Sequence, residues 1–235
     1  MRRYDYTIVL IMKKILLLIA ILLPFVFISC NNDDKDEPVV DNHEFVDLGL
    51  PSGTLWATCN VGANAPEEYG DYFAWGETSP KEVYYWSNYK WCNGNDYKLT
   101  KYCTESKYGF VDHKTQLSHE DDAAYVNWGA SWCMPTKEQE KELIDKCTWT
   151  ETAQNSVYGL LVTGPNGNTL FLPATGGKFD DGLYLTGSHG GYWSRTLYEF
   201  ESNKSYGLFF GSGRLDWESY RNNGFAVRAV RVSPN

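Results

Sequence analysis

The hydrophobic pattern of the chain falls into two unlike parts, and the first is a single apolar run near the start. This run extends from Ile15 to Ile28, follows two lysines and ends just before Cys30. A run of about 14 residues matches the apolar core of a signal peptide, whereas a helix that spans a bilayer needs about 20. We therefore predict a signal peptide over residues 1–29, with translation beginning at Met12. The alternative, an uncleaved anchor helix, would place the two lysines inside the membrane, which is costly.

The residues around Cys30 resemble a bacterial lipobox, in which a small residue precedes the cleavage point and the cysteine is acylated. The sequence there is Phe27-Ile28-Ser29-Cys30, and an acidic stretch without apolar residues follows. Such a stretch cannot bury enough surface to fold, so residues 30–42 are predicted to be a lipidated cysteine and its tether. The alternative is an ordinary secretory site with Cys30 as a structural thiol. The tether also resembles the acidic export tag of Bacteroidetes surface lipoproteins, which predicts a lipid-anchored outer-membrane protein that faces the cell exterior.

The second part of the chain, residues 43–235, carries short apolar stretches and is predicted to form one domain. Residues 45–61 are predicted to form a hairpin around a Pro-Ser-Gly turn. Residues 62–115 are rich in Tyr, Trp and Gly and show no regular period. A long irregular segment of this kind is either functional or packed by its own side chains.

Two helices are predicted after this segment, over residues 120–127 and 137–146. Ser118 stands where it could cap the first helix, and Gly129 stands where that helix should end. Thr136 precedes the second helix, and Gln139 follows three residues later as its capping-box partner. The second helix is therefore the better defined of the two.

From residue 157 onward the pattern predicts antiparallel strands joined by turns. The predicted strands lie at residues 157–163, 169–172, 191–194, 205–211 and 225–232. Asn-Gly at positions 166–167 supplies the positive φ that the first hairpin turn needs. Trp193, Leu208 and Phe210 are expected to be core residues of these strands. Two helices followed by a compact antiparallel sheet predict a loop-rich domain of the α+β class.

The charge of the chain limits the partners that it can have. The whole sequence has a net charge of −9, and removal of residues 1–29 leaves 17 basic and 29 acidic side chains, a net charge of −12. Nucleic acids and anionic membrane surfaces are bound chiefly through Lys and Arg. Nucleic acid is therefore not an expected partner, and contact with a membrane is expected through the lipid anchor only.

Five cysteines lie in the predicted domain, and an exported domain is expected to oxidise some of them. Cys92 and Cys103 flank an Asn-Gly-Asn turn signal and are one candidate disulfide. Cys59 and Cys147 are the second candidate, which leaves Cys133 unpaired. A metal site is the alternative, but no Cys-x-x-Cys or paired-histidine spacing supports it. A nucleophilic Cys133 is also conceivable, although no histidine is obviously paired with it. No cofactor and no metal are predicted.

Several motifs together resemble the Fibrobacter succinogenes major paralogous domain of Bacteroidetes lipoproteins. The resemblance extends over about residues 44–233 and rests on FVDLGLPSGTLWA (45–57), DDAA (121–124), WCMPTKEQE (132–140), GYWS (191–194) and GFAVR (224–228). Cys133 stands where that pattern has an arginine. Part of the pattern is also similar to formylglycine-generating enzymes. The resemblance implies a C-type-lectin-like fold, which hosts sugar binding, protein binding and catalysis in different proteins.

Catalysis is not predicted for this chain. Formylglycine generation requires a closely spaced cysteine pair in the C-terminal half, and no cysteine follows Cys147. The Glu-Pro-Asn and Gln-Pro-Asp motifs of calcium-dependent lectins are also absent from the sequence. Asp180 and Asp181 offer ligands for a structural calcium, although a plain turn is the favoured interpretation.

The candidate ligand-binding surface lies between residues 192 and 223. Trp217, Tyr220 and Arg221 stand in a polar stretch there, with Tyr198 as an outer member. Trp and Tyr stack on sugars, and with Arg they dominate protein-binding hot spots. We therefore expect a non-enzymatic surface module that binds a glycan or a protein. The alternatives are a structural component of a surface assembly and a catalyst similar to formylglycine-generating enzymes.

Overall fold

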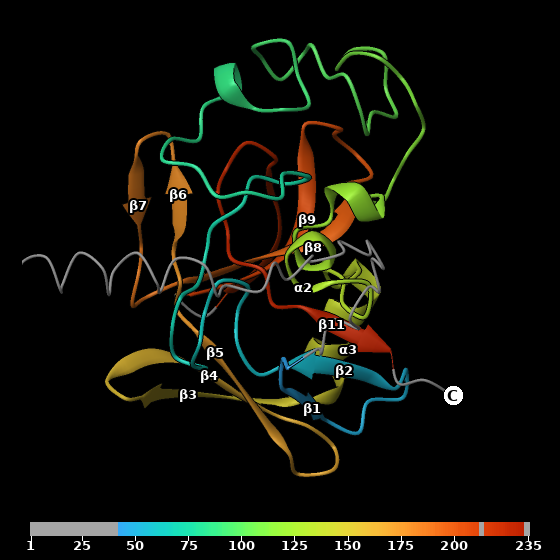
Figure 1. The fold of residues 1–235 in the computed structure, drawn as a ribbon. Helices are drawn as coiled ribbons and strands as arrows, with labels where there is room; N and C mark the ends of the chain where they lie inside the picture. The colour runs from blue at the N-terminus through green and yellow to red at the C-terminus, as the bar shows by residue number, and fades with distance from the viewer. Residues whose placement is uncertain (1–41, 212–213, 233–235) are drawn as a thin grey trace, which may run out of the picture. The chain divides into compact units, whose positions relative to one another are not determined.

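The computed structural model describes residues 42–211 and 214–232, and only the backbone of residues 214–217 and 232. The described residues belong to one unit, residues 39–235 (Figure 1). The predicted signal peptide, Cys30 and nearly all of the predicted tether lie outside the described residues. No helix in the described part of the chain is long and apolar enough to cross a membrane.

The first sheet joins the beginning of the domain to its end. Its strands, all antiparallel, are β1 (Phe45–Asp47), β2 (Thr54–Ala57) and β11 (Val230–Val232), with β2 in the middle (Figure 1). The predicted N-terminal hairpin is confirmed, since Phe45 pairs with Ala57 and Gly53 in the turn has a φ of +70°. The predicted last strand is shorter than expected. Residues 225 and 226 form only single bridges, to Phe73 and Tyr192.

The second sheet carries most of the predicted ligand-binding segment. Its strands, in the order β10-β9-β8, are β8 (Gly190–Leu197), β9 (Lys204–Gly211) and β10 (Arg214–Tyr220). β8 and β9 confirm two predicted strands, whereas β10 was expected to be a polar loop. β10 lies at the edge of the sheet and pairs with β9 alone, with a bulge between Asp216 and Glu218. Residues 214–218 of β10 alternate between polar and apolar side chains, but polar residues predominate in the strand, which an edge strand tolerates.

The remaining strands form two further antiparallel sheets. The larger contains β3 (Thr148–Gln154), β4 (Val157–Thr163) and β5 (Thr169–Pro173), and the smaller is the hairpin of β6 (Gly177–Phe179) and β7 (Gly182–Tyr184). The predicted β4–β5 hairpin is confirmed, and Gly167 in its turn has a φ of +87°. β3 was not predicted. The β6–β7 hairpin turns at Asp180 and Asp181, because Phe179 pairs with Gly182.

Two α-helices connect the early and late parts of the domain. The helical elements are η1 (Trp86–Asn88), η2 (His119–Asp121), α2 (Ala123–Trp128) and α3 (Lys137–Lys146). The capping box of Thr136 and Gln139 is confirmed at α3. The prediction of Ser118 as a helix cap is wrong, since its side chain makes no capping bond. Asp122 caps α2 instead, by accepting from the backbone N–H groups of Ala124 and Tyr125.

The prediction of an α+β, C-type-lectin-like domain is corrected by this architecture. Strand accounts for 35% of the structure and helix for only 12%, and the strands form four small antiparallel sheets. The domain is therefore mainly β. The helices are short because Asp122 starts α2 later than predicted and Gly129, with a φ of +93°, ends it after six residues. β3 and β10 add strand where sequence predicted none.

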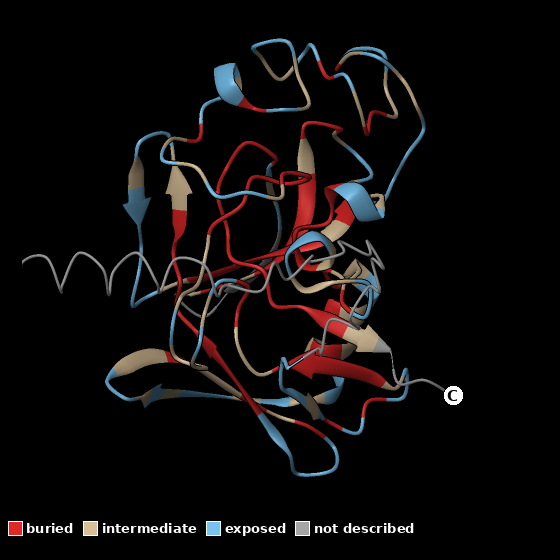
Figure 2. Ribbon diagram, in the orientation of Figure 1, coloured by how far each residue is buried: buried red, intermediate tan, exposed pale blue. Residues whose placement is uncertain are grey.

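The two largest groups of buried hydrophobic side chains among the described residues are an aromatic and an aliphatic cluster, which two smaller groups accompany. Figure 2 shows the buried positions of the chain in red. The aromatic cluster is built around Trp75, Trp132 and Trp193, each at most 1% exposed. The aliphatic cluster packs the apolar face of α3 and the β3–β4–β5 sheet against β9. Trp193, Leu208 and Phe210 are buried, which confirms that they are core residues.

Candidate functional site

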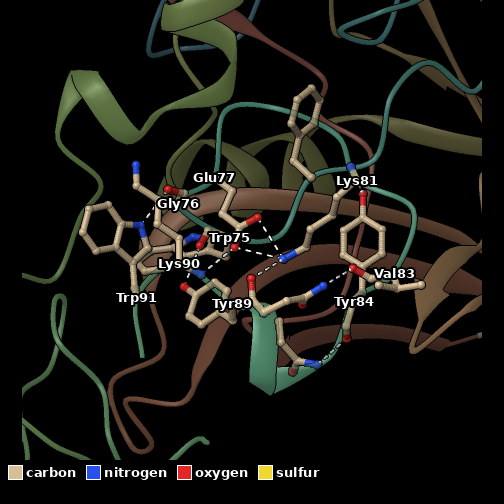
Figure 3. Close-up of polar contacts among 12 residues, drawn as sticks. Trp75, Gly76, Glu77, Lys81, Val83, Tyr84, Tyr89, Lys90 and Trp91 are labelled. Atoms are coloured by element: carbon tan, nitrogen blue, oxygen red, sulfur yellow. Dashed lines mark hydrogen bonds and ion pairs between the residues drawn. The ribbon is translucent and has the colours of Figure 1, made fainter. Parts of the chain in front are cut away.

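A buried carboxylate organises the start of the long aromatic segment that follows β2 (Figure 3). Glu77 is almost fully buried, and it accepts hydrogen bonds from the backbone N–H of Lys90 at 2.8 Å and from Lys81 Nζ at 3.0 Å. Beside it, the Tyr89 hydroxyl donates to the backbone oxygen of Trp75 at 2.6 Å. These bonds join parts of the segment that have no repetitive secondary structure, so its side chains replace the missing backbone ladder.

A second buried carboxylate, Asp121, fixes the end of the same segment. It accepts from Lys101 Nζ at 2.5 Å, from the Tyr102 hydroxyl at 2.6 Å and from Lys90 Nζ at 3.2 Å. Burial alone would lower the pKa of Lys101, but its bonds to Asp121 and Tyr102 raise that pKa above its ordinary value. The segment is thus packed by its own side chains, one of the two interpretations that its sequence allowed.

Arg221 belongs to this buried network and not to a ligand-binding surface. Its side chain is fully buried, and its guanidinium carbon lies 4.8 Å from the centroid of the Trp75 ring. Its Nε donates to the Tyr89 hydroxyl at 2.9 Å. Its terminal nitrogens donate at 2.9–3.0 Å to three backbone oxygens, those of Lys101, Tyr102 and Ser202. The prediction of Arg221 as a ligand contact is therefore corrected, because no part of it reaches solvent.

The other predicted contacts lie around Lys204 on β9. Tyr220 is 46% exposed and Tyr198 is half-buried, and Lys204 Nζ lies 5.4 Å and 6.0 Å from their ring centroids. Trp217 lies on β10, and its side chain is outside the described part of the chain. The structure thus brings Tyr198 and Tyr220 to one place through a residue that the sequence did not single out.

Two further exposed aromatic rings are linked to these tyrosines, Phe200 by direct contact and Tyr97 through Tyr108 and Glu201. Phe200 is 65% exposed and contacts the ring of Tyr198, with centroids 5.4 Å apart. Tyr97 is 63% exposed and stacks on Tyr108. The Tyr108 hydroxyl in turn donates to Glu201 in the β8–β9 loop at 3.4 Å. We call the set of Tyr97, Tyr198, Phe200 and Tyr220 the aromatic surface.

Charged groups hold the aromatic surface together. Lys204 forms an ion pair with Glu201, and the hydrogen bond between them raises the pKa of Lys204 and lowers that of Glu201. Both groups are therefore charged at neutral pH. Asn203 also donates to Asp96 at 3.0 Å, which ties the β8–β9 loop to the segment that carries Tyr97. The surface is assembled from three separate stretches of sequence, so no local signal marks Tyr97 or Phe200.

A cavity of about 320 Å³ lies between the β6–β7 hairpin and the β8–β9–β10 sheet. Its wall combines glycines with phenylalanine rings, among them Phe179, Phe209 and Phe225, and it includes Glu218 and Ser219 of β10. A volume near 300 Å³ and an apolar lining with few polar groups are typical of small-molecule sites. Because Tyr220 is the last residue of β10, this strand borders both the cavity and the aromatic surface.

The five cysteines of the described residues are all free thiols, so neither predicted disulfide is present. Cys92 and Cys103 pack in the same small cluster, but their sulfur atoms donate to different backbone oxygens, those of Trp86 and Glu105. Cys59 lies near Thr58, and Cys147 packs against the aliphatic cluster at the end of α3. The spacing and turn signals that suggested the pairs do not fix where the side chains point.

We expect this thiol state to be measurable. Alkylation of the unfolded full-length chain without a reductant should label each of Cys59, Cys92, Cys103, Cys133 and Cys147, as read by peptide mass spectrometry. Prior reduction serves as the control and should add no label at these five positions. A gain of label at exactly two of them after reduction would instead identify a disulfide.

Metal binding has no geometric support among residues 42–211 and 214–232. No group of three or more His, Cys, Asp and Glu side chains there is placed to hold an ion. Asp180 and Asp181, the candidates for a structural calcium, occupy the two-residue turn of the β6–β7 hairpin. Asp180, the first residue of this turn, has a φ of +53°, and the favoured two-residue hairpin turns have a positive φ at that position.

Comparison of the chain with protein-family models, with curated proteins and with solved structures gave no match. The resemblance to the Fibrobacter succinogenes major paralogous domain therefore stays a prediction, and the site must be interpreted from its own geometry.

Proposed function

We propose that this chain is a lipid-anchored surface protein whose domain binds a glycan or a protein outside the cell and catalyses no reaction. The observation that carries the proposal is the aromatic surface. Monomeric proteins bury most large aromatic rings, and exposed rings that gather in one place commonly mark a binding site. The predicted signal peptide, lipidated Cys30 and acidic tether support the location.

A glycan is the ligand that we would test first. Aromatic rings provide faces on which sugar rings stack, and the hydroxyl groups of Tyr198 and Tyr220 add polar atoms at the ring edges. Glu201 and Lys204 supply a charged acceptor and a charged donor next to these rings. The same residue types also form hot spots in protein interfaces, so a protein ligand is the second outcome of the test.

The proposal predicts that removal of the exposed rings weakens binding without unfolding the domain. The full-length chain in neutral detergent would be screened on a glycan array, and the affinity for any bound glycan measured by calorimetry. Phe200→Ala and Tyr220→Ala should each weaken binding at least ten-fold, since a central aromatic contact contributes about 2 kcal/mol.

Tyr184→Ala is the matched control, because Tyr184 is 52% exposed on the β6–β7 hairpin and lies outside the aromatic surface. Equal binding by all three variants and the parent chain would reject the aromatic surface as the site. If no glycan binds, the surface of the parent chain should instead capture a protein that Phe200→Ala and Tyr220→Ala lose. Copurification of a stable complex that survives both substitutions would favour a structural role in a surface assembly.

A further inference from the structure

A second cavity, of about 400 Å³, lies beside α2 and has a cationic lining. His119 of η2, Arg195 of β8 and Arg231 of β11 line it, and its described lining includes no Asp or Glu. The positive charge of this lining is opposite in sign to the net charge of the chain, which is −9. A negatively charged protein repels anions in general, so an anion must be bound by a local group of positive charges such as this one.

Arg195 has a donor group that its neighbours leave unused. Its terminal Nη2 donates to the backbone oxygen of Leu117 at 2.6 Å. Its Nε is buried and has no hydrogen-bond partner among the described residues. A buried N–H without an acceptor is destabilising, so such groups call for an explanation.

The one carboxylate near Arg195 does not neutralise it well. Asp122 lies behind the cavity wall, and its closest approach to the guanidinium is 3.9 Å, at the limit of an ion pair. The oxygens of Asp122 already accept from the backbone N–H groups of Ala124, Tyr125 and Met134 at 3.0–3.1 Å. Among the described residues, Arg195 therefore makes no direct hydrogen bond to a carboxylate.

Arg231 and His119 are held in place by aromatic rings. The guanidinium of Arg231 lies 4.8 Å from the Phe45 ring and 5.6 Å from the Trp132 ring. His119 stacks on Tyr125 with ring centroids 4.4 Å apart and nearly parallel planes. Such contacts fix the orientation of a cation and reduce the entropy that it loses on binding.

Two uncharged groups complete the wall. Ser131 is exposed and supplies a hydroxyl donor, and Cys133 lies beside Arg195. Burial raises the pKa of Cys133 and its neighbour Asp122 adds to the shift, so the thiol stays neutral. Cys133 thus brings no negative charge that would compete with a bound anion.

We propose that this cavity binds the oxyanion group of a ligand, a carboxylate or a phosphate, between Arg195, Arg231 and His119. Guanidinium groups suit this role because their planar N–H donors match the oxygen spacing of both groups. The site is separate from the aromatic surface and does not depend on the function proposed for it. Its ligand would be a small molecule or the acidic terminus of a larger one.

The experiment is a titration of the full-length chain in neutral detergent with inorganic phosphate, glucuronate and methyl glucoside, at low ionic strength. Phosphate and glucuronate present the two oxyanions, and methyl glucoside is a neutral sugar. We expect at least one anion to bind at this cavity, and the neutral sugar not to bind there. The bound anion should shift the NMR signals of one of the four histidine rings, and His119→Gln should remove that signal.

Arg231→Gln and Arg195→Lys should each weaken anion binding at least ten-fold, whereas Lys204→Gln and Tyr220→Ala should leave it unchanged. Circular dichroism would check that each variant folds. If Arg195→Lys does not fold, the His119→Gln variant tests the proposal in its place. The proposal is overturned if neither anion binds, or if the Arg231→Gln and His119→Gln variants bind it as tightly as the parent chain. Because Tyr220→Ala tests the aromatic surface, failure of one proposal is distinguishable from failure of the other.

Discussion

Replacement of Arg221 by leucine is expected to lower the free energy of unfolding by about 3–5 kcal/mol, a large part of the stability of a typical domain. Leucine fills part of the volume but donates no hydrogen bond. The backbone oxygens of Lys101, Tyr102 and Ser202 would then be left buried without their partner. Each such oxygen is destabilising by about 1–3 kcal/mol. The contact between the guanidinium and the Trp75 ring would also be lost.

Urea unfolding followed by tryptophan fluorescence would measure the effect on the full-length chain. Lys98→Leu is the matched control, since Lys98 is exposed in the same segment and its loss should change stability by no more than about 0.5 kcal/mol. Arg221→Lys should fall between the two, because an ammonium keeps the charge but cannot reach all four acceptors. A loss below about 1 kcal/mol for Arg221→Leu would show that Arg221 does not hold the segment in place.

Replacement of Glu140 by methionine is expected to raise stability by about 2 kcal/mol at pH 8. Glu140 lies on α3 and is 1% exposed, and neither of its carboxyl oxygens makes a well-formed hydrogen bond among the described residues. The backbone N–H of Leu208 lowers the pKa of this carboxyl, but the effect of burial is larger. Burial raises its pKa well above the ordinary value for Glu. The folded state therefore takes up a proton that the unfolded state releases, so stability falls as the pH rises from below the ordinary pKa towards the raised one.

Methionine has a similar shape and no titrating group, so the gain should be larger at pH 8 than at pH 5. Glu138→Met is the control, because Glu138 is exposed in the first turn of the same helix. Thermal unfolding of both variants and the parent chain at the two pH values gives the comparison. Equal gains at both pH values, or no gain at pH 8, would contradict a buried and protonated Glu140.

Elements that depend on local sequence could be predicted from the chain alone. The capping box at Thr136 and Gln139 and the Asn-Gly turn before β5 are signals contained within a few residues. Their geometry is set by side-chain bonds to the neighbouring backbone, which act before any tertiary contact forms. The number of α-helices was predicted correctly for the same reason.

Elements that depend on distant partners could not be predicted in this way. β10 exists because β9 offers its free edge, and the short alternation of polar and apolar residues in β10 does not mark a strand by itself. The predicted α+β class was wrong because β10 was not expected and because α2 is shorter than predicted. Strand propensity reflects packing against neighbours more than an intrinsic preference of the backbone.

The candidate site also has features that local sequence predicts and features that depend on distant contacts. Exposed aromatics were expected in the last third of the chain, and Tyr198 and Tyr220 do lie together there. Arg221 stands next to Tyr220 in the sequence but turns inward, because its acceptors come from three distant segments. Tyr97 joins the surface across about one hundred residues. Composition identified the kinds of residue that matter, and only tertiary contacts decide which of them reach solvent.

The sheet that β2 shares with β1 and β11 also determines the order in which its strands can pair during folding. β2 emerges early in synthesis, but one of its two neighbours is among the last residues of the chain. Arg228, just before β11, bonds to Asn60 across 168 residues. Closing so long a loop is entropically slow. The N-terminal hairpin must therefore stay half-paired until β11 has been synthesised, and this sheet can be completed only after that last strand is available.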